Sequence, residues 1–217
     1  MDMNWTLPNI LTIFRLAAAP TVPLVILYFQ QPLSYSIALI IFFIAGITDF
    51  VDGYLARLWK QETAFGKMMD PIADKAMVIM ALMVLLLPFK FSPMIVIPTL
   101  IIIFREVLVS GLREFLGENA KLLSVTRLAK WKTSIQIIAI CSLFLSLIAK
   151  FYNTPGEDQL INENLINYSV NKTINLGSLS LLGSLSLLWI ATVLTFLSGY
   201  DYLQKALNFI KNETRND

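Results

Sequence analysis

Histidine is absent from this chain of 217 residues, and cysteine occurs once. Without histidine, no imidazole can bind a metal or act as a general base, so catalysis would have to use carboxylates, lysine, arginine or water. The single cysteine, Cys141, excludes an intrachain disulfide, and its apolar surroundings predict a small buried side chain. The sequence also shows no obvious activated serine or cysteine, which argues against a covalent enzyme intermediate.

Charged residues are scarce as well. They make up 15% of the chain, whereas hydrophobic residues make up 56%; in a soluble domain about a quarter of the residues are charged and roughly half are apolar. The apolar residues fall in runs close to the ~20 residues that cross a bilayer. No small-residue cleavage site follows the first run, so we expect no cleaved signal peptide. The composition predicts a single polytopic membrane domain over residues 1–217.

The apolar runs predict an all-α integral membrane protein with about six transmembrane helices. The expected segments are residues 8–29, 34–59, 66–87, 93–116, 126–151 and 176–197, the last with a possible extension toward residue 210. If the N-terminus is cytoplasmic, only three of the 17 basic residues lie outside, namely Lys90, Lys150 and Lys172. The positive-inside rule therefore predicts that both termini are cytoplasmic and that the polar stretch at about 152–175 is an external loop.

Four aspartates lie at the cytoplasmic ends of the second and third segments: Asp49, Asp52, Asp70 and Asp74. Within a helix, Asp49 and Asp52 share one face, and so do Asp70 and Asp74. Carboxylates at the edge of a bilayer are costly unless a cation compensates them, and oxygen ligands favour Mg²⁺, Mn²⁺ or Ca²⁺. The cluster predicts a membrane-embedded, metal-dependent enzyme that acts on a phosphate-rich substrate.

Small residues accompany the carboxylates and would let a bulky group approach the helix backbone. They are Gly53 and Ala56, which precede Arg57, and Gly66, which lies one turn before Asp70. Two other interpretations stay open: a structural Asp–Arg ion pair, and the binding site of a cation transporter. Transporters often repeat such a site in a second half, and this chain has one acidic cluster and no internal repeat.

The spacing of these residues resembles the signature of the CDP-alcohol phosphatidyltransferase family. The matching pattern is Asp49-x-x-Asp52-Gly53-x-x-Ala56-Arg57, followed by Gly66-x-x-x-Asp70-x-x-x-Asp74. Residues 4–15, 105–114 and 130–133 are similar to the bacterial phosphatidylglycerophosphate synthases of that family. This closer similarity covers most of residues 1–150 and is weak beyond the polar stretch.

The resemblance implies a reaction and assigns roles to the signature residues. Asp49, Asp52, Asp70 and Asp74 would bind Mg²⁺ or Mn²⁺, as two ions, and Asp74 would also be the general base. CDP-diacylglycerol would bind near the small residues and the arginine, which are Gly53, Ala56, Arg57 and Gly66. Attack by the acceptor hydroxyl would release CMP by direct displacement.

The acceptor implied by the resemblance is sn-glycerol 3-phosphate, and the product is phosphatidylglycerol phosphate. An acceptor with its own phosphate needs a second cationic pocket, for which guanidinium groups are suited. The candidates are Arg105, Arg113, Lys132, Thr12 and Arg15. Structural pairs of the two arginines with Glu106 or Glu114 are the alternative. Serine, inositol phosphate or phosphatidylglycerol stay open as other acceptors.

The resemblance also implies a setting for the enzyme. We expect a homodimer in a bacterial inner membrane, with its active site facing the cytoplasm. Its partners would be the two substrates and membrane lipids, and no nucleic acid.

Overall fold

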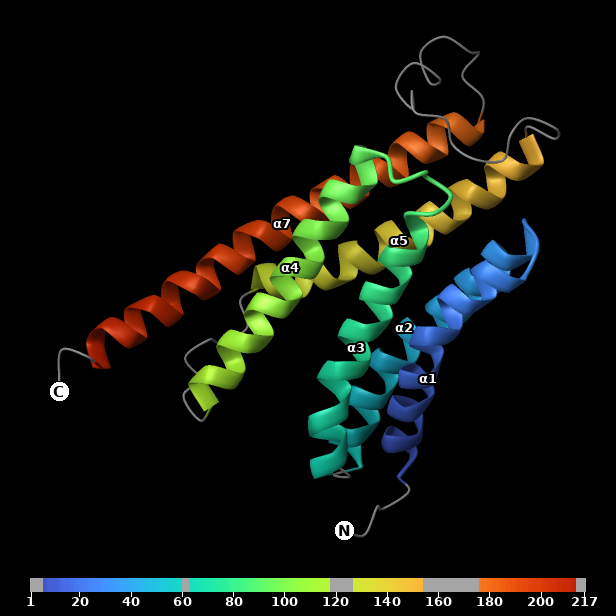
Figure 1. Cartoon of the computed structure of the whole chain (residues 1–217). Coiled ribbons are helices and arrows are strands. Elements are labelled where there is room, and N and C mark those ends of the chain that lie inside the picture. Colours follow the sequence, from blue (N-terminus) through green and yellow to red (C-terminus); the bar gives the residue numbers. More distant parts are fainter. Residues whose placement is uncertain (1–5, 60–62, 118–126, 154–175, 214–217) are drawn as a thin grey trace. The chain divides into compact units, whose positions relative to one another are not determined.

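The computed structural model describes residues 6–59, 63–117, 127–153 and 176–213 (Figure 1). Its regular elements over these residues are long helices, and no strand occurs among them. The helices are α1 (Leu7–Tyr28), α2 (Leu33–Leu58), α3 (Ala64–Leu85), α4 (Pro93–Leu116), α5 (Arg127–Asn153) and α7 (Leu176–Glu213). The predicted all-α class is confirmed for the described part of the chain.

The helix boundaries follow the apolar runs to within about two residues, except at the C-terminal end of α7. There the helix continues to Glu213, as the expected extension anticipated. Prolines lie in the first turns of α1 and α4, where the missing N–H needs no partner. Thr63 caps α3, because its hydroxyl accepts a hydrogen bond from the Gly66 N–H at 3.0 Å. The predicted external loop lies mostly outside the described residues.

Four described helical segments are long and apolar enough to cross a membrane. They are Leu7–Tyr28, Pro93–Leu116, Thr133–Tyr152 and Leu179–Lys211, and a shorter apolar stretch covers Leu33–Asp49. Helix α2 contributes only that shorter stretch, and α3 is not among the four segments. Many large apolar side chains in the described helices are exposed, as a lipid-facing surface requires. These features support an integral membrane protein, while the count of six spans and the side of the termini stay predictions.

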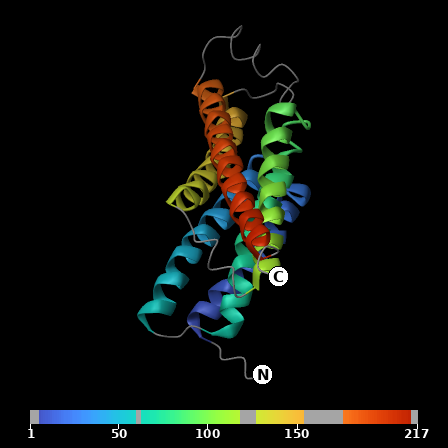
Figure 2. The same cartoon turned by 90° about the vertical axis from the view of Figure 1, so that its left-hand side faces the viewer.

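The described helices form two compact units, and the last two helices contribute to both. Unit 1 comprises Met1–Ser92 and Ile140–Ser184, and unit 2 comprises Pro93–Ala139 and Leu185–Asp217. In unit 1, α1 packs along both α2 and α3, which scarcely touch each other (Figure 1, Figure 2). Helix α1 is therefore the element that joins the two aspartate-bearing helices.

Small side chains allow this close packing. Ala18 and Ala19 of α1, Ala45 of α2, and Ala73 and Ala81 of α3 are all buried. Membrane helices gain little from burying large apolar groups away from lipid, so close backbone approach through small residues contributes much of their association.

In unit 2, α4 packs against α7. Val109 and Leu116 of α4 form a buried cluster with Tyr202 and Ala206 of α7. The indole N–H of Trp189 donates to the backbone carbonyl of Met94 at 3.1 Å. The pairing of these two helices positions the arginines of α4 described below.

The packing of α1 generates a first prediction. Ala19→Leu adds volume where the side chain is 1% exposed, and overpacking of this kind costs about 1–3 kcal/mol. We expect a lower midpoint of thermal unfolding in detergent. Ala17 is exposed on the same helix, so Ala17→Leu adds the same atoms without the clash and is the matched control. Equal destabilisation by the two substitutions would contradict the packing.

Candidate active site

A buried arginine on α1 lies among the carboxylates of the signature. The Arg15 side chain is 1% exposed, and its Nη1 donates to the Oδ1 atoms of Asp49 and Asp74. Its Nη2 lies 3.3 Å from Oδ1 of Asp70. One guanidinium therefore brings together a carboxylate from α2 and two carboxylates from α3.

The three carboxylates are far more accessible than the arginine. The side chains of Asp49, Asp70 and Asp74 are 39%, 44% and 46% exposed. Thr12, one turn before Arg15 on α1, donates to Asp70 Oδ1 at 2.6 Å. The carboxylates are thus bound from the α1 side by Arg15 and Thr12, while much of their surface stays open to a ligand.

A second group of contacts fixes the start of α3 beside this cluster. The Thr63 hydroxyl donates to Oδ1 of Asn9 at 2.7 Å, and Asn9 itself is 3% exposed. A Cβ on Gly66 would lie 3.2 Å from Asn9 Oδ1, 3.3 Å from Thr63 Oγ1 and 3.8 Å from Asp70 Oδ2. The missing side chain of Gly66 therefore makes room for Asn9 and Thr63. The sequence had predicted a different reason, the close approach of a substrate.

Asn9 and Thr63 were not among the predicted site residues. A buried polar residue in an apolar run was the available signal for Asn9, since burying an amide without a partner is costly. Nothing in the local sequence identified Thr63 as its partner, because the two residues are far apart along the chain.

The chemistry of the donor set fits a hard divalent cation, because it consists of carboxylate oxygens that already share one positive group. Within the described residues, however, no group of three or more His, Cys, Asp or Glu side chains is arranged to hold a metal ion. In this structure Arg15 supplies the positive charge between Asp49, Asp70 and Asp74. The structure does not describe the side-chain positions of several predicted site residues, namely Asp52, Gly53, Ala56, Arg57 and Lys132.

The predicted acceptor residues that are described fall into the two units. Thr12 and Arg15 belong to unit 1 with the aspartates, whereas Arg105 and Arg113 belong to unit 2. Within unit 2, both α4 arginines contact Tyr202 of α7. The Cζ atoms of Arg105 and Arg113 lie 5.3 Å and 5.6 Å from the centre of its ring, which is cation–π range.

Further contacts hold each arginine. Arg105 Nη2 donates to the Ser198 hydroxyl at 3.1 Å, and its Nη1 lies 3.6 Å from a carboxylate oxygen of Glu106. Arg113 Nη2 donates to the Tyr202 hydroxyl at 3.4 Å. The pair with Glu106, which was one of the alternatives, is thus present, at a long distance, and one carboxylate cannot neutralise two guanidinium groups.

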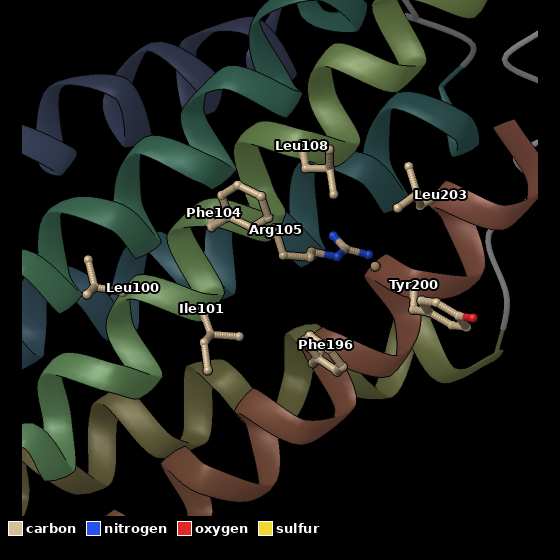
Figure 3. Close-up of a pocket in the computed structure, with 9 residues that line it drawn as sticks. Leu100, Ile101, Phe104, Arg105, Leu108, Phe196, Tyr200 and Leu203 are labelled. Carbon is tan, nitrogen blue, oxygen red and sulfur yellow. The ribbon is translucent and has the colours of Figure 1, made fainter. Parts of the chain in front are cut away.

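Arg105 also borders a cavity of about 440 Å³ in unit 2. Its other lining residues are apolar or small side chains and one tyrosine: Leu100, Ile101, Phe104, Leu108, Phe196, Gly199, Tyr200 and Leu203. Figure 3 shows Arg105 extending from α4 toward α7, with Phe104 and Leu108 beside it on α4. Arg105 is the charged residue among these lining residues, and the surface of the cavity is almost wholly apolar.

Comparisons with known proteins identify the family. The family model described as CDP-alcohol phosphatidyltransferase matches residues 5–197. The chain belongs to the CDP-alcohol phosphatidyltransferase family. The predicted resemblance is confirmed, and the family match reaches residue 197, beyond the polar stretch at about 152–175.

Full-length relatives agree with this assignment. A Cereibacter sphaeroides protein named CDP-diacylglycerol–glycerol-3-phosphate 3-phosphatidyltransferase is 47% identical over 97% of this chain and 100% of its own length. Relatives with the same name from Rickettsia bellii and Haemophilus influenzae are 40% and 39% identical, each over 94% of this chain. They are covered over 97% and 95% of their own lengths. The chain is therefore an enzyme of a family that generally depends on divalent metals.

The position of Arg15 between three carboxylates generates a second prediction. Arg15→Gln leaves three carboxylates without their common donor, at a cost of about 1–3 kcal/mol because the carboxylates are partly exposed. We expect a lower thermal midpoint in metal-free detergent and a partial recovery on addition of Mn²⁺, which can neutralise the same oxygens.

Lys75→Gln is the matched control, because it removes one positive charge next to Asp74 on α3. If Arg15→Gln destabilises the protein no more than Lys75→Gln does, the carboxylates do not depend on Arg15.

Proposed function

We propose that this enzyme transfers the phosphatidyl group of CDP-diacylglycerol to sn-glycerol 3-phosphate, giving phosphatidylglycerol phosphate and CMP. The observation that carries the proposal is the convergence of three signature aspartates on one point, in a chain that matches glycerol-phosphate transferases over nearly its whole length. Family membership disfavours the cation transporter, and no observation of the structure supports it.

The aspartates form the reacting centre in this proposal. Asp49, Asp52, Asp70 and Asp74 would hold Mg²⁺ or Mn²⁺, as two ions in the manner of the family, and bound metal would neutralise charge on the diphosphate. Asp74 would accept the proton of the acceptor hydroxyl, which then attacks the β-phosphorus. Arg15 and Thr12 hold the carboxylates from α1 and fix the angle at which they face the substrate.

The donor would lie along Gly53, Ala56, Arg57 and Gly66. Gly66 lies at the first turn of α3, where backbone N–H groups favour an anion. Its lack of a side chain lets Asn9 and Thr63 pack against this turn. The acyl chains of the donor would remain in the lipid.

The acceptor phosphate is assigned chiefly to Arg105 and Arg113, with Lys132 as a further cation. The two guanidinium groups share the ring of Tyr202, and a single glutamate near Arg105 leaves the group with a net positive charge. Thr12 and Arg15 bind the aspartates, so we propose that they serve the acceptor by orienting its base rather than by holding its phosphate.

We also propose the setting that the family resemblance implies. The chain would be a single polytopic domain that crosses a bacterial inner membrane six times and acts as a homodimer. Both termini and the reacting centre would face the cytoplasm.

The decisive experiment is CMP release from CDP-diacylglycerol by purified protein with Mg²⁺ or Mn²⁺. Glycerol 3-phosphate, serine, inositol phosphate and phosphatidylglycerol are offered separately, and we expect release with glycerol 3-phosphate alone. Asp70→Asn should abolish release while leaving the thermal midpoint near that of the unmodified protein, because the amide keeps the shape but loses the charge. Release with another acceptor would retain the family and overturn the acceptor assignment.

Arg113→Ala tests the phosphate pocket. Loss of a charged hydrogen bond to phosphate costs about 1.5–3 kcal/mol, so we expect the KM for glycerol 3-phosphate to rise by roughly one to two orders of magnitude. The KM for CDP-diacylglycerol should change much less. Tyr202→Phe is the companion variant, since it removes the hydroxyl bound by Arg113 and keeps the ring. Equal changes in both KM values for Arg113→Ala would contradict the pocket.

A further inference from the structure

Helix α7 carries a glycine at the point where Arg105 of α4 meets it. A Cβ built on Gly199 would lie 2.8 Å from Cγ of Arg105 and 3.8 Å from its Cβ. Non-bonded carbon atoms are at optimal separation near 3.5–4.0 Å, so roughly an ångström is missing. The clash falls near the root of the arginine side chain, and relieving it requires another rotamer that moves the guanidinium.

The same turn of α7 binds the guanidinium. Ser198 accepts from Arg105 Nη2 at 3.1 Å, and its own hydroxyl proton goes to the carbonyl of Thr195 at 2.9 Å. Tyr202 offers its ring to the cation. Ser198, Gly199 and Tyr202, which we call the α7 seat, lie on adjoining parts of one helix face, because Tyr202 is four residues after Ser198 and three after Gly199.

Helical flexibility does not explain the glycine. Helix α7 continues without a break through Gly199, where alanine would be the better helix former. At Gly111 of α4 and Gly183 of α7, a Cβ would meet nothing within 4 Å. Gly199 therefore differs from these helical glycines by its contact with Arg105. The α7 seat also lies just beyond residue 197, where the family match ends.

One donor of the seated arginine is left for a ligand. Arg105 is 8% exposed, and its Nε is buried without a hydrogen-bond partner among the described residues. Leaving a buried N–H unsatisfied is costly, whereas a phosphate oxygen accepts well from a guanidinium edge. The side chain also borders the 440 Å³ cavity, whose surface is almost wholly apolar.

We propose that the α7 seat positions Arg105 for the phosphate of the acceptor, with Gly199 as the positioning residue that admits the side chain against α7. This inference rests on the proposed function. It adds that acceptor binding requires residues of α7 that do not themselves touch the acceptor.

The test measures the KM of each substrate in the full-length enzyme. Gly199→Ala displaces Arg105, so the KM for glycerol 3-phosphate should rise about tenfold or more, while the KM for CDP-diacylglycerol and kcat at saturating acceptor change by less than about twofold. Gly111→Ala and Gly183→Ala are matched controls on α4 and α7, and both should leave all three constants unchanged.

A double-mutant cycle separates positioning from general helix packing. On an Arg105→Ala background the clash is gone, so adding Gly199→Ala should not raise the acceptor KM further. Multiplicative effects would mean that Gly199 acts independently of Arg105 and would overturn the inference. Ser198→Ala keeps the glycine and removes one anchor, so we expect a smaller selective rise of about threefold to tenfold.

The outcomes distinguish the two proposals. If the unmodified enzyme releases no CMP with glycerol 3-phosphate, the proposed function fails whatever the variants do. If it does release CMP, and Ser198→Ala and a folded Gly199→Ala both leave the acceptor KM unchanged, only the role of the α7 seat fails. If Gly199→Ala does not fold, the acceptor KM of Ser198→Ala decides the inference alone, with no change counting against it.

Discussion

The ion pairs between Arg15 and three carboxylates are the interaction on which unit 1 depends. A buried guanidinium in a membrane helix is costly without anions, and clustered carboxylates are costly without a cation. Because Arg15 is on α1, Asp49 on α2, and Asp70 and Asp74 on α3, compensating these charges requires all three helices. The alanines that line their contacts then allow the helices close enough for the charges to meet.

This arrangement is compatible with both a structural Asp–Arg pair and a metal site. The two were alternatives in the sequence, yet Arg15 is buried while the three carboxylates are roughly two-fifths exposed. A carboxylate has lone pairs on two oxygens and can accept from an arginine and face a cation at the same time. The structural pair on the α1 side therefore prepares the oxygens that a divalent ion would bind on the open side.

The sequence predicted the elements well and their partners poorly. Apolar runs and flanking prolines located the helices, and helical spacing placed each pair of aspartates on one face. The sequence did not anticipate the contacts of Arg15 with the aspartates, and it missed Asn9 and Thr63. Periodicity defines a face of one helix and leaves open which helix covers that face. The sequence of α7 likewise does not show why residue 199 is a glycine, because the side chain that a Cβ would clash with, Arg105, belongs to α4.

The different surroundings of Arg15 and Arg105 argue for different roles. Arg15 faces three carboxylates, so its site carries a net negative charge until a cation binds there. Arg105 faces one carboxylate at 3.6 Å, a hydroxyl and an aromatic ring that it shares with a second arginine. The ring and hydroxyl stabilise the two cations without cancelling their charge. The positive environment of Arg105 therefore suits a phosphate, whereas the negative one around Arg15 suits a divalent cation or a proton.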